Sequence, residues 1–293
     1  MSLAPNIRMQ PRRGSIAGAR LIRHRSLDGS DLRMKAKPPN WGDDSLSTFL
    51  RDADYNTKVT AANYPTVFES LKRVDSAFIR ARECMEKDSG WISLVPRFLL
   101  VRTHSSFLAA LRVGMSGQIG EASVLLRVGV EQSWYALHMA SGQDAERRTN
   151  IWLQRNENPA ATNACKGEFT ITNVRSTHSA LDPAAAADLH RLYSTLIDYG
   201  AHPNQMGVFT SVQSTETEGA VSFQVRILHP AELPVMFTLR MAMAMAIAGL
   251  KIFQLIYPER FALVGLDIEI QHLVAELNTK FKQYGSNGSA VSV

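Results

Sequence analysis

The sequence predicts a mainly α protein: an antiparallel helical bundle with a small β-hairpin insertion. Apolar residues recur at three- and four-residue steps through most of the chain, which is the period of a helix with one buried face. Prolines begin several of these stretches and glycines end some of them, as helices favour. Strict alternation of apolar and polar residues is convincing at one place only, between Val221 and Ile227, and it indicates a strand.

Three segments are expected along the 293 residues. Residues 1–44 form a basic, disordered N-terminal tail and linker, because the paired prolines and the glycine of "KAKPPNWGDD" interrupt regular structure. Residues 45–284 form one helical bundle domain, with the β-hairpin at about 207–228. Residues 285–293, "GSNGSAVSV", form a disordered C-terminal tail.

The first predicted helix begins at Pro65, in "YPTVFESLKRVDSAFIRARECMEK". A second, "VPRFLLVRTHSSFLAALRVGM", is expected to begin at Pro96, and a third is "EASVLLRVGVEQSWYALHMA". Asp144 is expected to cap a shorter helix. The chain therefore opens with consecutive helices joined by short, glycine-containing turns.

The next segment, "TNACKGEFTITNVRSTHSAL", is ambiguous, because its β-branched residues favour a strand as much as a helix. The clearest helix of the chain follows, "DPAAAADLHRLYSTLIDYG". Asp182 is expected to cap its start, Pro183 suits the first position, and Gly200 is expected to close it.

The hairpin is expected to pair "GVFTSVQ" with the strand at Val221–Ile227 through a polar turn, "STETEG", and to lie on the helical body. After it, "ELPVMFTLRMAMAMAIAGLKIFQLIYP" is apolar on all sides, as a central core helix must be. Its uncharged run between Arg240 and Lys251 is ten residues, too short for a bilayer, so no transmembrane segment is expected. A final helix is expected in "FALVGLDIEIQHLVAELNTKFKQY".

The net charge of +5 is concentrated at the N-terminus. Residues 1–40 hold nine basic residues and two acidic ones, a net +7, which leaves −2 for the remainder. This arm is predicted to bind RNA or another anionic polymer through non-specific phosphate contacts. Its candidate nucleic-acid-binding residues are Arg12, Arg13, Arg20, Arg23 and Arg25. The alternatives are a solvated leader and an organellar transit peptide, since the arm lacks the apolar core of a secretory signal.

The two cysteines, Cys84 and Cys165, lie far apart and outside any metal-binding spacing, which suits a reducing compartment. We therefore expect a cytoplasmic protein without a metal site. No glycine-rich phosphate loop or HExxH, GxSxG or EF-hand pattern occurs, so no cofactor is expected.

One polar stripe stands out on a helix that is otherwise apolar on most sides. At 100° per residue, Arg127, Glu131, Trp134 and His138 share one narrow face. Glu131 follows Arg127 by four residues, which permits an ion pair within the helix. The stripe is either a satisfied structural network or part of a ligand or catalytic site.

His202, in "LIDYGAHPN", is the third member of this candidate catalytic site with Arg127 and Glu131. If its imidazole reaches the stripe, the three residues form a pocket suited to phosphate binding or acid–base chemistry, with hydroxyls from Tyr193 and Tyr199. The structural alternative is that His202 caps a helix-ending turn, where the helix dipole favours a cation.

The stretch "LAALRVGMSGQIGEASVLLRVGVEQSWYALHMA", followed by "IWLQRN" and "LYSTLIDYGAHPN", resembles a group of bacterial helical proteins that is distantly HEPN-like. The resemblance covers roughly residues 65–285. It implies a helical bundle that is often dimeric. HEPN relatives include metal-independent ribonucleases of toxin and defence systems, and also inactive RNA-binding or scaffold members.

The ribonucleases of that group use an arginine and a histidine separated by four to six residues. Arg97 and His104 match this spacing, with His104 as general acid or base and Arg97 or Arg102 steadying phosphate charge. The match falls in an early helix, whereas the family's usual position is a late one.

The sequence thus leaves three functions open. The first is an HEPN-like, RNA-interacting protein, conceivably a ribonuclease. The second is a non-catalytic helical dimerisation or interaction module with a buried Arg–Glu–His structural network. The third, ranked last, is a small-molecule enzyme, which requires a cavity beside the stripe.

Overall fold

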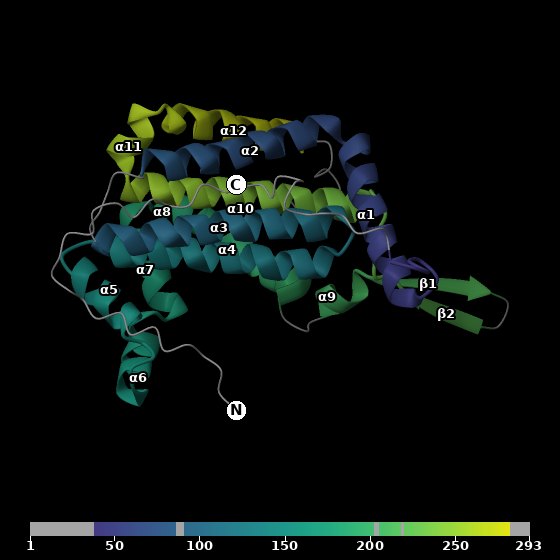
Figure 1. Cartoon of the computed structure of the whole chain (residues 1–293), viewed down its shortest axis with the longest axis horizontal. Coiled ribbons are helices and arrows are strands. Elements are labelled where there is room, and N and C mark those ends of the chain that lie inside the picture. Colours follow the sequence, from purple (N-terminus) through teal and green to yellow (C-terminus); the bar gives the residue numbers. More distant parts are fainter. Residues whose placement is uncertain (1–37, 86–90, 202–204, 218–219, 282–293) are drawn as a thin grey trace.

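The computed structural model describes residues 38–85, 91–201, 205–217 and 220–281, and it confirms the mainly α bundle with a small hairpin (Figure 1). The predicted tails, 1–44 and 285–293, lie outside these residues except for 38–44. The elements are α1 (Ser45–Asn63), α2 (Pro65–Cys84), α3 (Trp91–Met115), α4 (Ile119–Ala140), α5 (Ala145–Leu153), α6 (Pro159–Glu168), α7 (Ile171–Leu181), α8 (Pro183–Leu196), the π-helical turn η1 (Ile197–Ala201), α9 (Gln205–Phe209), β1 (Val212–Thr217), β2 (Ala220–Val225), α10 (Leu233–Ile256), α11 (Pro258–Leu263) and α12 (Leu266–Lys280).

Helix α10 is the central element of the bundle, as its composition predicted. It runs between the pair α2 and α12 and the pair α3 and α4 (Figure 1). Its side chains are buried on nearly every side, from Val235 to Phe253. By length and composition α10 is long and apolar enough to cross a membrane, but 72% of its most apolar window is buried inside the bundle. Burial on all sides explains why this helix has no polar face.

Helices α3 and α4 pack against each other more extensively than any other two described elements, and a tight turn at Ser116–Gln118 joins them. Helix α3 begins at Trp91, five residues before the predicted start, so Pro96 lies inside it. Pro96 is still in the second turn, where a missing N–H removes a single intrahelical hydrogen bond. Proline therefore predicted the helix correctly and its first residue wrongly.

The ambiguous stretch after residue 160 forms two short helices, α6 and α7. Their starts are capped by side chains: Asn158 accepts from the N–H of Ala161 at 2.9 Å, and Thr170 accepts from the N–H of Asn173 at 3.2 Å. These caps settle the competition in favour of helix despite the β-branched residues. Asp182 caps α8 as predicted, by accepting from the N–H of Ala185 at 3.0 Å.

Asp144, by contrast, precedes α5 without a capping hydrogen bond. Its carboxylate instead lies 3.4 Å from Arg147 and 3.8 Å from Arg148. The predicted final helix is also two helices, α11 and α12, because Gly265 between them has a left-handed φ of 67°.

The hairpin is where the structure departs most from expectation. Residues of "STETEG" that were expected to form the turn belong to β1, and Gly207, Val208 and Phe209 belong to α9 instead of the first strand. The strands pair antiparallel with Val212 opposite Val225 and Thr217 opposite Ala220. The expectation that the hairpin lies on the helical body is wrong: every residue of β2 is exposed, and the hairpin projects from one end of the bundle (Figure 1).

Candidate functional site

The polar stripe of α4 meets α8. The ion pair expected between Arg127 and Glu131 is present, with Arg127 Nε 2.9 Å from Glu131 Oε1. Tyr193 of α8 donates its hydroxyl to the same carboxylate oxygen at 2.8 Å, and the guanidinium lies 5.7 Å from the centre of the Tyr193 ring. The two charged side chains are 28% and 33% exposed, so the network lies at the edge of the core.

Electrostatics hold these groups in their usual charge states. Burial acts to lower the pKa of Arg127, but the hydrogen bond to Tyr193 and the charge of Glu131 outweigh it, so this pKa is raised. Burial, and then the hydrogen bond to Glu131, raise the pKa of the Tyr193 hydroxyl. Arginine therefore stays charged and tyrosine stays neutral, and neither is prepared to exchange a proton near neutral pH.

The stripe continues inward through Trp134. Its indole Nε1 donates to Nδ1 of His178 on α7 at 3.2 Å, and its ring packs against Tyr193 with ring centres 5.1 Å apart. Burial lowers the pKa of His178 to about 4. Because an indole N–H can only donate, Nδ1 accepts and the proton of the neutral ring lies on Nε2.

His138, at the end of the stripe, bonds two further side chains: Thr177 at 2.7 Å and Glu168 at 3.2 Å. Glu168 also accepts from Arg147 at 2.9 Å and from Arg148 at 3.0 Å. Burial, then the charge of Arg148, lower the pKa of His138. Burial acts to raise the pKa of Glu168, but the arginine hydrogen bonds outweigh it and the pKa is lowered. His138 is therefore neutral and Glu168 is charged. Their hydrogen bonds link α4 to α5, α6 and α7.

The structure also brings Arg175 and His190 into hydrogen-bond contact across α7 and α8. Burial, then the arginine charge, lower the pKa of His190. Sequence reasoning missed this pair, as it missed His178 and Glu168 as partners of the α4 stripe. Glu168, Arg175 and His178 lie in the stretch whose secondary structure was ambiguous, so no periodicity placed them against α4, and His190, although on a clearly predicted helix, was not singled out because its partner Arg175 lies in that stretch.

His202, the third member of the candidate catalytic site with Arg127 and Glu131, lies outside the described residues. The turn before it is described and corrects one prediction. Gly200 has a φ of 170°, which is extended backbone and not the left-handed closure expected of a helix-ending glycine. A Cβ on Gly200 would lie 2.2 Å from the carbonyl oxygen of Gly120, so glycine is needed there for close approach of two backbones.

Arg97 and His104, the pair with ribonuclease-like spacing, are both buried. His104 Nε2 lies 2.7 Å from Asp75 of α2, and its ring stacks on Phe78 with centres 4.8 Å apart. An RNA backbone could reach neither side chain without opening the bundle. The candidate residues Arg12, Arg13, Arg20, Arg23 and Arg25 lie outside the described residues.

Within the described part of the chain, no group of three or more histidine, cysteine or acidic side chains is placed to hold a metal ion. Apart from the Arg127–Glu131 pair within α4, the hydrogen bonds of this network join different helices, an arrangement suited to holding helices in register. Comparison with protein families, curated proteins and solved structures found no match for the chain. The HEPN-like resemblance therefore stays a prediction.

Proposed function

We propose that the chain is a non-catalytic helical dimerisation and interaction module, in which two copies associate through α9 and the β-hairpin. The observation that carries this proposal is the exposure of large apolar side chains on these elements. On the hairpin strand and just after it, Val221, Phe223, Val225 and Ile227 are between 53% and 70% exposed. Met206, Val208 and Phe209 of α9 are also exposed.

The apolar side chains of β2 form one face of the hairpin. Residues 221, 223 and 225 alternate along β2 and so project from the same side of the hairpin. Their partners on β1 are Glu216, Ser214 and Val212, whereas the opposite face carries glutamine, serine, threonine and alanine side chains. An isolated two-stranded hairpin is marginally stable in water, so a covering surface is needed.

A second copy of the chain fits this surface. A twofold contact places the same apolar face against itself, so one patch serves both partners. The seven apolar residues expose on the order of 700 Å², taking roughly 150 to 200 Å² for each when fully exposed. That is comparable with the roughly 800 Å² per partner of a stable interface. Both strands also have one edge unpaired among the described residues, which permits strand addition across the axis.

The polar network supports the non-catalytic half of the proposal. Arg127, Glu131 and Tyr193 satisfy one another, and the pKa values of Arg127 and Tyr193 are raised away from neutrality. A general acid or base needs a pKa near the working pH and access to its substrate. Fixed, mutually satisfied groups serve instead to hold α4 and α8 together.

Sedimentation velocity of the full chain tests the proposal with the variant Phe223→Lys. The wild type is expected to sediment as a dimer, and the variant near the monomer mass of 32.4 kDa, because burying an unpaired lysine in the middle of the apolar face, between Val221 and Val225, is costly. Gln224→Lys places the same charge on the opposite face and is the matched control, which is expected to remain dimeric. A monomeric wild type, or equal dissociation of both variants, would overturn the proposal.

A second candidate, RNA binding through residues 1–40, rests on the net charge of +7 in that segment. Filter binding of single-stranded RNA to the full chain tests it, against a variant with Arg12, Arg13, Arg20, Arg23 and Arg25 changed to glutamine. Binding that weakens with salt and falls at least about tenfold in the variant would support it. In the same samples, RNA cleavage lost in His202→Ala or His104→Ala would establish a ribonuclease and overturn the non-catalytic proposal.

A further inference from the structure

The helices α6 and α7, residues 159–181, bury few side chains against the bundle. Four residues of this segment are buried, Cys165, Phe169, Val174 and His178, compared with fifteen of the 24 residues of α10. Helix α6 projects from the side of the bundle, and α7 packs against α4 (Figure 1). Segments with few buried apolar contacts open at a lower free energy than the core. The segment can therefore separate from α4 while the core stays folded.

Histidines make most of the hydrogen bonds that hold this segment to α4. Four side-chain hydrogen bonds join α4 to residues 159–181 among the described residues. Three of them involve a histidine: Trp134 with His178, His138 with Thr177, and His138 with Glu168. The fourth runs from the Tyr135 hydroxyl to the carbonyl of Phe169. A change in the protonation of these histidines therefore acts directly on the attachment of α6 and α7.

His178 cannot take up a second proton and keep its hydrogen bond to α4. Its Nδ1 accepts from the indole Nε1–H of Trp134 at 3.2 Å, and an indole nitrogen can only donate. In the protonated ring Nδ1 also becomes a donor, so two N–H groups would face each other. The side chain is 2% exposed, and Nε2 has no hydrogen-bond partner among the described residues. The protonated ring is therefore costly in the closed arrangement.

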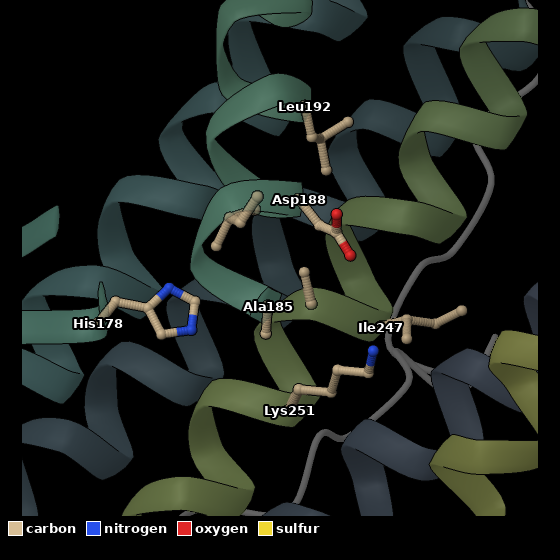
Figure 2. A pocket seen from close by; sticks show the side chains of 8 residues that line it. His178, Ala185, Asp188, Leu192, Ile247 and Lys251 are labelled. Carbon is tan, nitrogen blue, oxygen red and sulfur yellow. The ribbon is translucent and has the colours of Figure 1, made fainter. Parts of the chain in front are cut away.

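The charged groups around His178 do not remove this conflict. Asp182, at the end of α7, favours the protonated ring, but its carboxylate also caps α8, and His190 of α8 opposes protonation. Asp188 of α8 and Lys251 of α10 line the same small cavity as His178, with one charge of each sign (Figure 2). Burial has the largest effect, and it lowers the pKa of His178 to about 4.

Two further histidines of this interface act in the same direction. His138 contacts Glu168, but this carboxylate already pairs with two arginines of α5. His190 contacts Arg175 across α7 and α8. Burial first, and then the charge of a neighbouring arginine, lowers the pKa of both histidines. Protonation of either ring would add positive charge beside arginines, which also favours separation of the helices.

We propose that His178 and Trp134 form a pH-sensitive contact, which releases α6 and α7 from α4 when His178 is protonated, while α2, α3, α4, α10 and α12 stay packed. In the open form water solvates the protonated ring, and the indole N–H no longer faces it. Opening uncovers the side of α4 that carries Trp134 and His138, together with Val174 of α7, all of which are buried in the closed form. The contact lies on the helical body and does not depend on the proposed dimer.

The pH range of this opening follows from the two forms of His178. Its pKa is about 4 in the closed form and returns to the ordinary 6.5 when the ring is exposed, so the open form binds the proton more tightly. The closed form keeps its full advantage above pH 6.5 and loses it as the pH falls toward 4. Between pH 7 and 5 the ratio of open to closed molecules is expected to rise about 20-fold from this residue.

Hydrogen–deuterium exchange of the full chain at pH 7 and pH 5, corrected for the intrinsic exchange rate at each pH, tests the proposal. Peptides of α7 are expected to be less protected than peptides of α10 at both pH values, and their protection is expected to fall about 20-fold or more at pH 5. Equal protection of α7 and α10 would mean that α7 opens only when the whole bundle unfolds. A fall in α7 of less than about threefold would mean that protonation does not control the opening. Either result overturns the proposal.

Two variants assign the effect to one histidine. His178→Asn keeps an acceptor for the Trp134 N–H but does not titrate, so the fall in α7 protection is expected to be at least about fivefold smaller than in the wild type. A smaller reduction overturns the proposal. His272→Asn removes an exposed histidine of α12 and is the matched control, which is expected to keep the wild-type fall. If His178→Asn fails to fold by circular dichroism, the comparison of α7 with α10 in the wild type decides.

Discussion

The helical body and the hairpin differ in which side chains they bury and which they expose. In the body, polar side chains turn inward and find partners: Trp134 donates to His178, and His138 contacts Thr177 and Glu168. In the hairpin, apolar side chains such as Phe223 and Val225 face outward with nothing described against them. The body thus satisfies most of its polar groups within the chain, whereas the hairpin leaves a row of apolar side chains uncovered, which is the surface that the proposed dimer would bury.

The two regions are joined at His229, which is buried just after the hairpin. Its N–H donates to the carbonyl of Gly117 at 2.9 Å, and its ring Nε2 lies 3.2 Å from the hydroxyl of Ser211 at the base of β1. Asn56 of α1 donates its side-chain amide to the His229 carbonyl at 3.3 Å. The hairpin therefore projects from a fixed base, and its exposure is not the result of a loose attachment.

A substitution that disrupts the base of the hairpin is expected to have the largest effect on stability. Gly117 has a φ of 99°, and a Cβ there would lie 2.2 Å from the backbone oxygen of His229. Gly117→Ala is therefore expected to lower the free energy of unfolding by about 4 kcal/mol, since both the dihedral angle and the contact must change. Urea unfolding followed by circular dichroism measures this loss.

Gly142→Ala is the matched control for that variant. Gly142 also has a positive φ, 71°, but a Cβ there meets no atom within 4 Å. It is expected to cost about 1 kcal/mol, the price of the dihedral angle alone. Equal losses in the two variants would mean that the contact between Gly117 and His229 does not hold the hairpin base to the body.

The body was more predictable than the hairpin because its signals are local. The apolar surface of α10 and the cap of Asp182 on α8 depend on residues within a turn or two of each other. The partners of Gly200 and Trp134 are not local: Gly120 lies on another helix, and His178 is 44 residues from Trp134. Composition showed that these residues were unusual, but only packing shows what they contact.

The hairpin shows what a local sequence pattern cannot predict. Alternation at Val221, Phe223 and Val225 predicted a strand correctly, because alternation reports the backbone period. It also implied a covered face, and it carries no information on whether the cover is this chain or another. The second strand was therefore predicted correctly, whereas the extent of the first strand, the turn and the position of the hairpin relative to the bundle were not.

The pH dependence of unfolding tests the comparison between the helical body and the hairpin in a second way, with a smaller expected change in stability. The pKa of His178 is about 4 in the folded chain, below the ordinary 6.5, so the unfolded chain binds this proton more tightly. Stability from this residue is complete above pH 6.5 and falls by roughly 3 kcal/mol as the pH drops to 4. The pKa values of His138, His190 and His229 are also lowered, first by burial, and they act in the same direction. Thermal or urea unfolding between pH 7 and 4 measures the slope.

His178→Asn isolates the residue responsible. An asparagine amide oxygen can take the place of Nδ1 and accept from Trp134, but it does not titrate, so the variant is expected to lose much less stability across the same pH range. An unchanged slope would assign the acid sensitivity to the other histidines. Self-association offers the contrast: the side chains of β2 that form the proposed interface are all uncharged, so sedimentation of the folded protein between pH 7 and 5 is expected to stay constant. If self-association and the free energy of unfolding decreased together over that range, the hairpin and the helical body would behave as one cooperative unit. The distinction between a body stabilised within the chain and a hairpin that binds a second copy would then be wrong.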